Sequence, residues 1–380
     1  MIQYYILLSL VIGFVIVSYF IPKIILISRE KKLFDVPNER SASRVITPNL
    51  GGIAIFAGFY VSLNVALHSF NTQSITPLLL ASVVMFLIGL KDDLIGLSAR
   101  KKLFFQVLTA MYLIFLGGVR ISSLHGIMGI YEIDPYTSSV ISLVAIVGIV
   151  NAYNLIDGID GLAAGIGILI SVAFGALFTL SGQTVYAIAA FSLTGSLVAF
   201  FFFNVFSRVN KIFMGDTGSL TLGIIFAFLT IKFLDHPSSA HQQLFGSPGV
   251  ALSIMIVPLV DTIRVMAIRI WQKRSPFSPD MNHIHHHLIR LTNNNHLHAS
   301  MILIFWNMAY IAFACSFVYL FNINLLFFFI LGAGFFMAAI PVWVNKRNEK
   351  AAMNKASVEI KVIQLNSENL KQRVQSGEGR

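Results

Sequence analysis

The chain has 380 residues, of which 56% are hydrophobic and only 12% are charged. Soluble domains carry roughly 25% charged residues, so this composition excludes an ordinary water-soluble protein and indicates a polytopic membrane protein. The formal net charge of +10 would also suit a protein that binds nucleic acid, and the placement of the charges must decide between the two. The single cysteine, Cys315, excludes an intramolecular disulfide and a cysteine-based metal cluster.

Apolar runs long enough to cross a bilayer, ~20 residues each, recur along almost the whole chain. They lie near residues 3–22, 51–68, 77–95, 104–119, 137–154, 161–180, 184–203, 217–234, 249–268, 300–321 and 323–344. We therefore predict an all-α membrane protein with about eleven transmembrane helices. The first run lacks a preceding basic region and a small-residue cleavage site, so we expect a membrane helix and not a signal peptide.

The basic residues set the predicted topology. With the N-terminus outside, only Arg120 and Lys232 of the 27 lysines and arginines fall in outer loops, as the positive-inside rule requires. The C-terminus is then cytoplasmic, and the basic charge belongs to a membrane surface and not to a nucleic-acid interface. We divide the chain into a membrane domain, residues 1–345, and a polar cytoplasmic tail, residues 346–380, expected to be a surface or partly disordered helix. The outer segment 120–136, which glycines and a proline interrupt, predicts a small hairpin or loop.

Four polar side chains stand between two apolar runs at residues 151–161. Asn151, Asn154, Asp157 and Asp160 recur at intervals of three and would form one slowly turning stripe on a helix. Ionisable groups at membrane depth are costly, so a functional site is the favoured interpretation. The alternative is a solvated helix end at which two glycines only terminate the helix.

Further carboxylates lie at the cytoplasmic ends of other predicted helices. Asp92 and Asp93 follow Lys91 and precede a basic stretch that includes Lys102. Adjacent helical positions point about 100° apart, so the two acids are not expected to share one role; ordinary surface ion pairs are the alternative. Asp216 begins the string Asp-Thr-Gly-Ser at the start of an apolar run, where free backbone N–H groups beside a carboxylate suit a phosphate with a divalent cation.

The first cytoplasmic loop contains the segment Asp35–Arg40 and then Pro48, Gly51 and Gly52. The two glycines permit close approach of the backbone to a ligand or to a neighbouring helix. By itself, however, this pattern favours a plain loop.

Four histidines fall close together near the end of the membrane domain: His283, His285, His286 and His287. A zinc site is one interpretation, because His283 and His287 would share a helical face. The HExxH pattern is absent, however, and the surrounding arginines and lysines favour anions over a second cation. We therefore favour contact with an anionic phosphate.

Carboxylates, basic loops and histidines thus gather on one membrane face. Hard oxygen ligands without cysteine suit Mg²⁺ or Mn²⁺. A divalent ion among phosphates, with Lys, Arg and His donors, is the usual equipment for phosphoryl transfer. A site open both to the cytoplasm and to the bilayer implies one soluble substrate and one lipid substrate.

Taken jointly, the motifs resemble those of the bacterial polyprenyl-phosphate N-acetylhexosamine-1-phosphate transferases, the WecA/TagO group related to MraY. The resemblance rests on Lys91-Asp-Asp93, the segment 151–161, the segment 213–219 and His283-Ile-His-His-His287, in the family's order and spacing. It implies transfer of an N-acetylhexosamine-1-phosphate, expected to be GlcNAc-1-phosphate, from a UDP-sugar to undecaprenyl phosphate, with release of UMP, at the cytoplasmic face of a bacterial inner membrane.

The resemblance also implies roles for particular residues. The expected catalytic residues are Asp92, Asp93, Asp157 and Asp160, and the expected Mg²⁺ ligands are Asp216 and Asn154. The expected substrate-binding residues are Lys91, Lys102, Asn151, Asn154, His283, His285, His286 and His287. A direct in-line attack by the lipid phosphate and a covalent aspartyl intermediate are both chemically allowed. A homodimer is compatible with these expectations.

Other functions stay open at this point. A phospho-MurNAc-pentapeptide transferase is the nearest alternative, and an ion-coupled transporter is a more distant one, since no internal repeat is obvious. An intramembrane aspartyl protease would leave the histidines unexplained. Neither the sugar nor the polysaccharide pathway follows from the residues, because related sugars differ by a single hydroxyl or methyl group.

Overall fold

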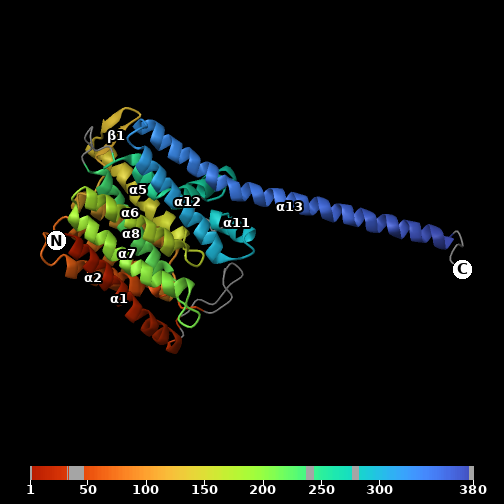
Figure 1. Ribbon diagram of the computed structural model, residues 1–380, viewed down its shortest axis with the longest axis horizontal. Helices are drawn as coiled ribbons and strands as arrows, with labels where there is room; N and C mark the ends of the chain where they lie inside the picture. Colours follow the sequence, from red (N-terminus) through yellow and green to blue (C-terminus); the bar gives the residue numbers. More distant parts are fainter. Residues whose placement is uncertain (1, 32, 34–46, 237–243, 276–281, 376–380) are drawn as a thin grey trace.

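The computed structural model describes residues 2–31, 33, 47–236, 244–275 and 282–375. In these residues the chain is almost entirely helical, with one small antiparallel sheet (Figure 1). The elements are α1 (Ile2–Glu30), α2 (Gly51–Ala66), α3 (Thr76–Ile95), α4 (Ala99–Met111), the π-helical turn η1 (Tyr112–Leu116), β1 (Ser123–Ile127), β2 (Ile130–Glu132), α5 (Pro135–Leu155), α6 (Leu162–Leu180), α7 (Thr184–Val205), α8 (Gly215–Leu234), α9 (Pro248–Ile254), α10 (Ile256–Trp271), α11 (Ile284–Leu291), α12 (His296–Phe317) and α13 (Ile323–Gln375).

Helix α8 lies at the centre of the bundle. In its most apolar window, 89% of the residues are buried inside the protein, and it packs against α2, α3, α5 and α6. A helix that is hydrophobic on every side has to be enclosed by other helices, which is the position that α8 takes. Asp216 lies in the first turn of α8, so the packing of this central helix sets the position of that carboxylate.

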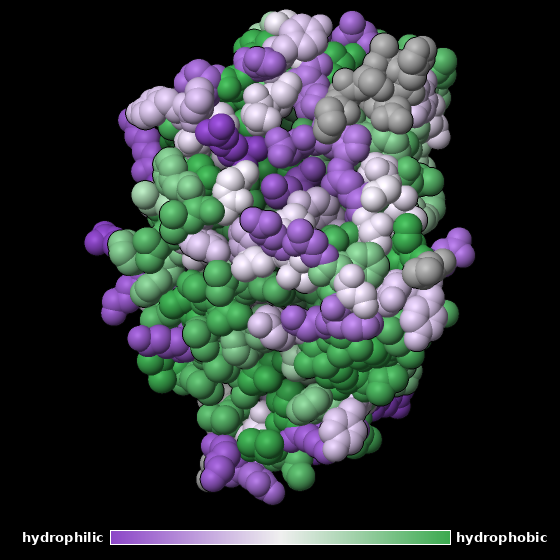
Figure 2. All heavy atoms as spheres, turned by 90° about the vertical axis from the view of Figure 1, so that its left-hand side faces the viewer, coloured by the Kyte–Doolittle hydropathy of each residue, from purple (hydrophilic) through white to green (hydrophobic). Residues whose placement is uncertain are grey.

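The outer helices expose apolar side chains, as lipid-facing helices do. On α1, for example, Leu7 and Val15 are more than half exposed. Figure 2 shows one side of the molecule, on which hydrophobic residues gather in a broad band. Seven described helices are long and apolar enough to cross a membrane, or eight if the bent pair α9–α10 is one span. The prediction of an all-α polytopic membrane protein is confirmed. The number of spans and the sidedness stay predictions, although every one of the predicted apolar runs coincides with helix.

One predicted run, residues 249–268, is broken in the structure. Helices α9 and α10 meet at Met255 with a bend of 82°. The buried side chain of Asn307, on α12, compensates the break: its Nδ2 donates to the carbonyl of Ile254 at 3.2 Å, and its Oδ1 accepts from the N–H of Val257 at 3.4 Å. Pro258 stands four positions after Ile254 and has no N–H, so the helix itself offers no donor for this carbonyl, and the side-chain amide of Asn307 supplies one.

The expected hairpin of the outer segment is present as β1 and β2, which pair Ser123 with Glu132 and Ile127 with Ile130. Helix α13 continues without interruption through the predicted domain boundary at residue 345 and extends far beyond the bundle (Figure 1). The polar tail is therefore joined to the membrane domain by a helix and not by a flexible linker.

Candidate active site

The start of α8 is held by backbone hydrogen bonds against the residues that lead into α2. The N–H of Phe213 donates to the carbonyl of Pro48 at 2.8 Å, and the N–H groups of Gly51 and Gly52 donate back to the carbonyls of Phe213 and Met214, both at 2.9 Å. Gly51 and Gly52 thus approach a neighbouring helix, one of the two uses that the sequence allowed. The segment Asp35–Arg40 of the first predicted loop lies outside the described residues.

A glycine makes the turn into α8 possible. Gly215 has a φ of +71°, and a Cβ at this position would collide with the carbonyl oxygen of Asn49. Both the left-handed backbone and the close contact require a residue without a side chain. The chain can therefore turn sharply into α8 immediately before Asp216.

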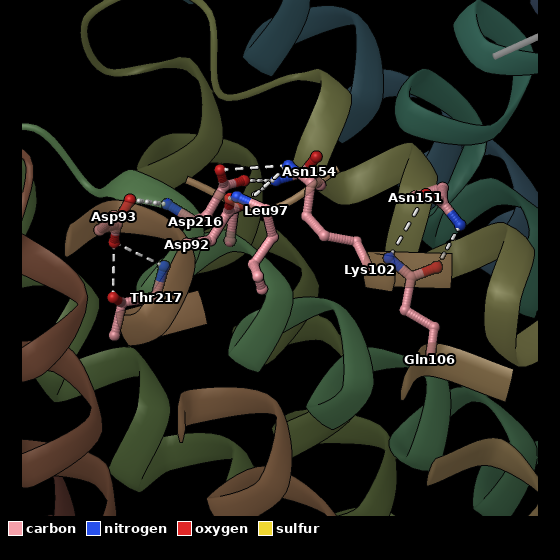
Figure 3. A network of polar contacts seen from close by, with 10 residues as sticks. Asp92, Asp93, Leu97, Lys102, Gln106, Asn151, Asn154, Asp216 and Thr217 are labelled. Atoms are coloured by element: carbon pink, nitrogen blue, oxygen red, sulfur yellow. Dashed lines mark hydrogen bonds and ion pairs between the residues drawn. The ribbon is translucent and has the colours of Figure 1, made fainter. Parts of the chain in front are cut away.

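Asp93 binds the first turn of α8 (Figure 3). Its Oδ1 accepts from the N–H of Asp216 at 2.8 Å, and its Oδ2 accepts from both the N–H and the hydroxyl of Thr217, at 2.8 and 2.5 Å. These N–H groups have no partner within the helix, and a carboxylate here is also favoured by the helix dipole. Both oxygens of Asp93 are therefore engaged in holding α8.

The neighbouring Asp92 points to different partners. Its Oδ1 accepts from the N–H of Leu97 at 2.6 Å, and its Oδ2 lies 2.7 Å from the Nζ of Lys102. The same Nζ lies 3.4 Å from the Oδ2 of Asp216. Lys102 thus stands between two carboxylates that come from α3 and α8 (Figure 3).

Asn154 reaches Asp216 from the end of α5. Its Nδ2 lies 2.5 Å from the Oδ1 of Asp216 and 2.7 Å from the hydroxyl of Ser219. The two residues that the resemblance assigns to a metal ion are therefore in direct contact. The same side chain also carries an amide oxygen, which is a suitable ligand for a hard cation.

The two aspartates of the 151–161 segment have different surroundings. Asp160 lies 2.6 Å from the Nζ of Lys211 and 3.4 Å from the Nδ1 of His296, and its carbonyl accepts from the hydroxyl of Ser300 at 2.7 Å. Burial alone would raise the pKa of Asp160, but the hydrogen bonds from His296 and Lys211 lower it below its usual value. Asp160 is thus committed to an ion pair that anchors the loop.

Asp157 has no hydrogen-bond or ion-pair partner for its carboxylate among the described residues. Burial, followed by the negative charges of Asp216, Asp93 and Asp160, raises its pKa to about 8. A carboxylate that is surrounded by other carboxylates and lacks a balancing cation is destabilised in its charged form. Asp157 is therefore the aspartate of this segment that is free to act on a ligand.

The remaining residues predicted around the acids are placed differently. Lys91 is exposed and makes no ion pair with these carboxylates. Asn151 forms an amide pair with Gln106 of α4: its Nδ2 donates to the Oε1 of Gln106 at 2.6 Å, and its Oδ1 accepts from the Nε2 of Gln106 at 3.4 Å. Of the stripe 151–160, only Asn154 contacts Asp216 directly.

The histidine cluster begins helix α11, which Asp261 of α10 anchors. The Oδ2 of Asp261 lies 3.0 Å from the Nδ1 of His283, and its Oδ1 accepts from the N–H of Ile284 at 2.9 Å. Arg264 donates to the same carboxylate at 3.0 Å and also to the carbonyl of Asn282. A buried acid with three such partners fixes the position and the rotation of the helix start.

His285 joins this helix to the acidic segment. A Cβ at Gly158 would lie 2.6 Å from the Nε2 of His285, so the imidazole rests directly against the backbone between Asp157 and Asp160. Burial, and next the charge of neighbouring histidines, lowers the pKa of His285 to about 3 and that of His286 to about 4. Both rings are therefore neutral near pH 7 and can donate or accept one hydrogen bond at each nitrogen.

The end of α11 is attached to α13. The Nδ2 of Asn345 donates to the carbonyl of His287 at 2.9 Å and lies 3.3 Å from the Nδ1 of the same residue. Asn345 is buried at the last position of the predicted membrane domain. The long C-terminal helix thus forms part of the support for the histidines.

Sequence reasoning missed several residues that hold the site together: Gln106 as a partner of Asn151, Asn204, Asp261, His296 and Asn345. Asn204 is buried and joins the N–H of Gly161, at 2.7 Å, to the carbonyl of Ile212, at 2.9 Å. Asp261 could have been recognised, because an acid inside an apolar run is itself a signal of function. The other contacts depend on which helices, distant in sequence, pack together, and no local sequence pattern predicts them.

The donor set fits a small, hard cation. Asp216, Asn154 and Asp157 supply oxygen atoms, and the charge around Asp157 is unbalanced among the described residues. Mg²⁺ commonly takes one or two carboxylates from the protein and completes its shell with water and substrate phosphates. Within the described part of the chain, no group of three or more His, Cys, Asp or Glu side chains could hold a metal ion by itself.

Comparison with known proteins gives consistent matches. The model of a family described as glycosyl transferase family 4 matches residues 75–234, which include every acid around Lys102 but not α11. The chain is 30% identical over 271 residues to the undecaprenyl-phosphate alpha-N-acetylglucosaminyl 1-phosphate transferase of Escherichia coli O157:H7, covering 70% of this chain and 71% of that protein. It is 31% identical over 335 residues to the decaprenyl-phosphate N-acetylglucosaminephosphotransferase of Mycobacterium leprae, covering 81% and 82%.

Proposed function

The chain belongs to glycosyl transferase family 4, and from this premise we propose that it transfers a sugar-1-phosphate from a UDP-N-acetylhexosamine to a polyprenyl phosphate. We further propose UDP-GlcNAc as donor, undecaprenyl phosphate as acceptor, UMP as second product and the cytoplasmic face of a bacterial inner membrane as location. The names of the related proteins support GlcNAc and a polyprenyl acceptor.

One observation carries the proposal: Lys102 lies between Asp92 and Asp216, and Asn154 contacts Asp216. A lysine is suited to neutralise phosphate oxygens, and oxygen ligands next to it suit the divalent ion that accompanies a diphosphate. Acid and base groups from three helices thus meet where a diphosphate and a lipid phosphate would have to be brought together.

We assign Mg²⁺, or Mn²⁺ in its place, to Asp216, Asn154 and Asp157. When bound, the ion would offset the charge that develops on the non-bridging and leaving oxygens. Lys102 would orient the phosphates, since its Nζ can exchange a carboxylate for a phosphate oxygen without leaving this position. Asp92 would keep that ammonium group in place.

The reaction that we propose is a direct in-line attack. A phosphate monoester is largely dianionic near pH 7, because its second pKa is about 6, so an acceptor oxygen can form the new P–O bond without first losing a proton to the protein. The bond between the β-phosphorus and the bridging oxygen breaks, and UMP leaves. Asp93 is poorly suited as a covalent nucleophile, because both of its oxygens are engaged by the start of α8. His285, His286 and His287 would contact the donor as neutral hydrogen-bonding groups.

The test is turnover by the purified full chain with undecaprenyl phosphate, a panel of UDP-sugars and Mg²⁺, with UMP as the measured product. We expect UMP with UDP-GlcNAc, loss of turnover after chelation by EDTA, and recovery on adding Mg²⁺ or Mn²⁺. Asp216→Asn should remove turnover while the protein still inserts into membranes. UMP release only with UDP-MurNAc-pentapeptide would replace the proposal by the peptidoglycan alternative, and no UMP with any donor would refute it.

A further inference from the structure

The side-chain amides of Gln106 on α4 and Asn151 on α5 form a pair, and this pairing leaves few hydrogen-bonding groups for a ligand. Both N–H groups of the Asn151 amide are used, one on the Oε1 of Gln106 at 2.6 Å and the other on the carbonyl of Val147 at 2.8 Å. Its oxygen faces the Nε2 of Gln106 at 3.4 Å (Figure 3). Asn151 therefore has no free donor for a nucleotide, although its place in the 151–161 segment suggests substrate binding.

Gln106 lies one helical turn after Lys102 on α4. Positions four apart on a helix share a face, so the contact that fixes Gln106 also fixes the direction from which Lys102 extends toward Asp92 and Asp216. Gln106 is almost fully buried, with 3% of its surface exposed. A buried amide that loses its partner is costly, which ties the rotation of α4 to α5.

We infer that Gln106 and Asn151 together are a positioning device that holds Lys102 between Asp92 and Asp216. Asn151 acts through α4 and does not touch the substrate. The inference rests on the proposed function for its kinetic consequences, but the position of Lys102 can be measured without any turnover.

The kinetic test is a double-mutant cycle on the full-length protein. Gln106→Ala and Asn151→Ala should each lower kcat about tenfold, since each removes the same contact, and the double variant should be no worse than either single variant. The KM for the UDP-sugar should stay within about twofold. In a Lys102→Ala background, Asn151→Ala should cause little further loss. Exchange of the two amides, Gln106→Asn with Asn151→Gln, should recover part of the activity because the total length of the pair is kept.

Thr109→Ala is the matched control, because within the described part of the chain the hydroxyl of this buried α4 residue bonds only to the carbonyl of Phe105 in its own helix. It should retain wild-type kcat. If Asn151→Ala instead raises KM strongly and its loss multiplies with that of Gln106→Ala, Asn151 contacts the nucleotide and the inference is wrong.

A second measurement does not depend on activity. In membranes, a lysine-acylating reagent followed by peptide mass spectrometry reports the protection of Lys102, with the exposed Lys91 as internal reference. We expect labelling of Lys102 to rise severalfold in Gln106→Ala and in Asn151→Ala, with Lys91 unchanged. Unchanged labelling of Lys102 would overturn the positioning role even if the wild type transfers sugar-phosphate. Raised labelling in a protein without turnover would leave the device standing and refute only the proposed function.

Discussion

The contact between Gly158 and His285 allows a sharp test of how the histidine helix meets the acidic segment. Gly158→Ala adds one methyl group 2.6 Å from the Nε2 of His285, where ordinary contact begins at 3.4 Å. Gly158 is not among the residues with positive φ, so the substitution acts through this contact and not through backbone strain. Either the ring or the segment 157–160 must move by almost 1 Å, a displacement that can cost about a hundredfold in rate at a catalytic centre.

The assay is steady-state kinetics with varied UDP-sugar, together with thermal unfolding in detergent. We expect kcat/KM to fall by about ten- to a hundredfold, with a modest loss of stability typical of an overpacked site. Gly148→Ala is the matched control, because a Cβ there meets nothing within 4 Å, and it should behave as wild type. Wild-type kinetics for Gly158→Ala would show that α11 does not rest against this segment in the working enzyme, and the reasoning would fail.

Three further predictions follow from the contacts around the site. Asp93→Asn leaves only one acceptor oxygen for the start of α8, so it should lower the free energy of unfolding by about 2 kcal/mol. The control is Glu132→Gln at an exposed position, and an unchanged Tm for Asp93→Asn would contradict the role of Asp93. Asn345→Ala should raise the KM for the UDP-sugar severalfold, because it removes the hydrogen bond to the carbonyl of His287. Asn354→Ala, at an exposed position on the same helix, should not raise it. Equal KM values for the two variants would argue against a role for the contact between Asn345 and His287. The depressed pKa of His285, about 3, means that its neutral form stabilises the fold above the ordinary histidine pKa of about 6.5, and that this contribution is lost as the pH falls from there toward 3. Asp157, whose pKa is raised to about 8, acts in the opposite direction, so the prediction concerns the difference between the two proteins. On acidification over this window, the Tm of the wild type should shift downward relative to that of His285→Gln, and an identical slope in the variant would count against it.

Much of the fold could be predicted from the sequence, because every apolar run of sufficient length became a helix. That Asp92, Asn154 and Asp216 lie close together was also predictable, because polar and charged groups at the ends of membrane helices face one another or water and not lipid. The break at Met255 was not predicted, although Pro258 removes the helical donor for the carbonyl of Ile254; that the replacement donor is Asn307, far along the chain, does not follow from local sequence.

Which partners each aspartate contacts could be determined only from the structure. Which of Asp92 and Asp93 faces Lys102 depends on the rotation of α3, and sequence periodicity determines that only to within a residue. Asp157 and Asp160 differ because Lys211 and His296, from two other segments, reach only Asp160. Such partners are set by tertiary contacts, which local spacing does not encode.

The bend between α9 and α10 also has a consequence for the order in which the protein is made. The carbonyl of Ile254 accepts a hydrogen bond from Asn307, which lies 53 positions later in the chain, on α12. Pro258, four positions after Ile254, has no N–H, so a continuous helix could not satisfy this carbonyl either, and the contact with Asn307 cannot form until α12 has been synthesised and inserted. The position of α10, and with it the anchor that Asp261 gives to the histidines, is therefore completed late in biogenesis. A chain released before α12 would contain all the acids of the site and still lack the geometry to use them.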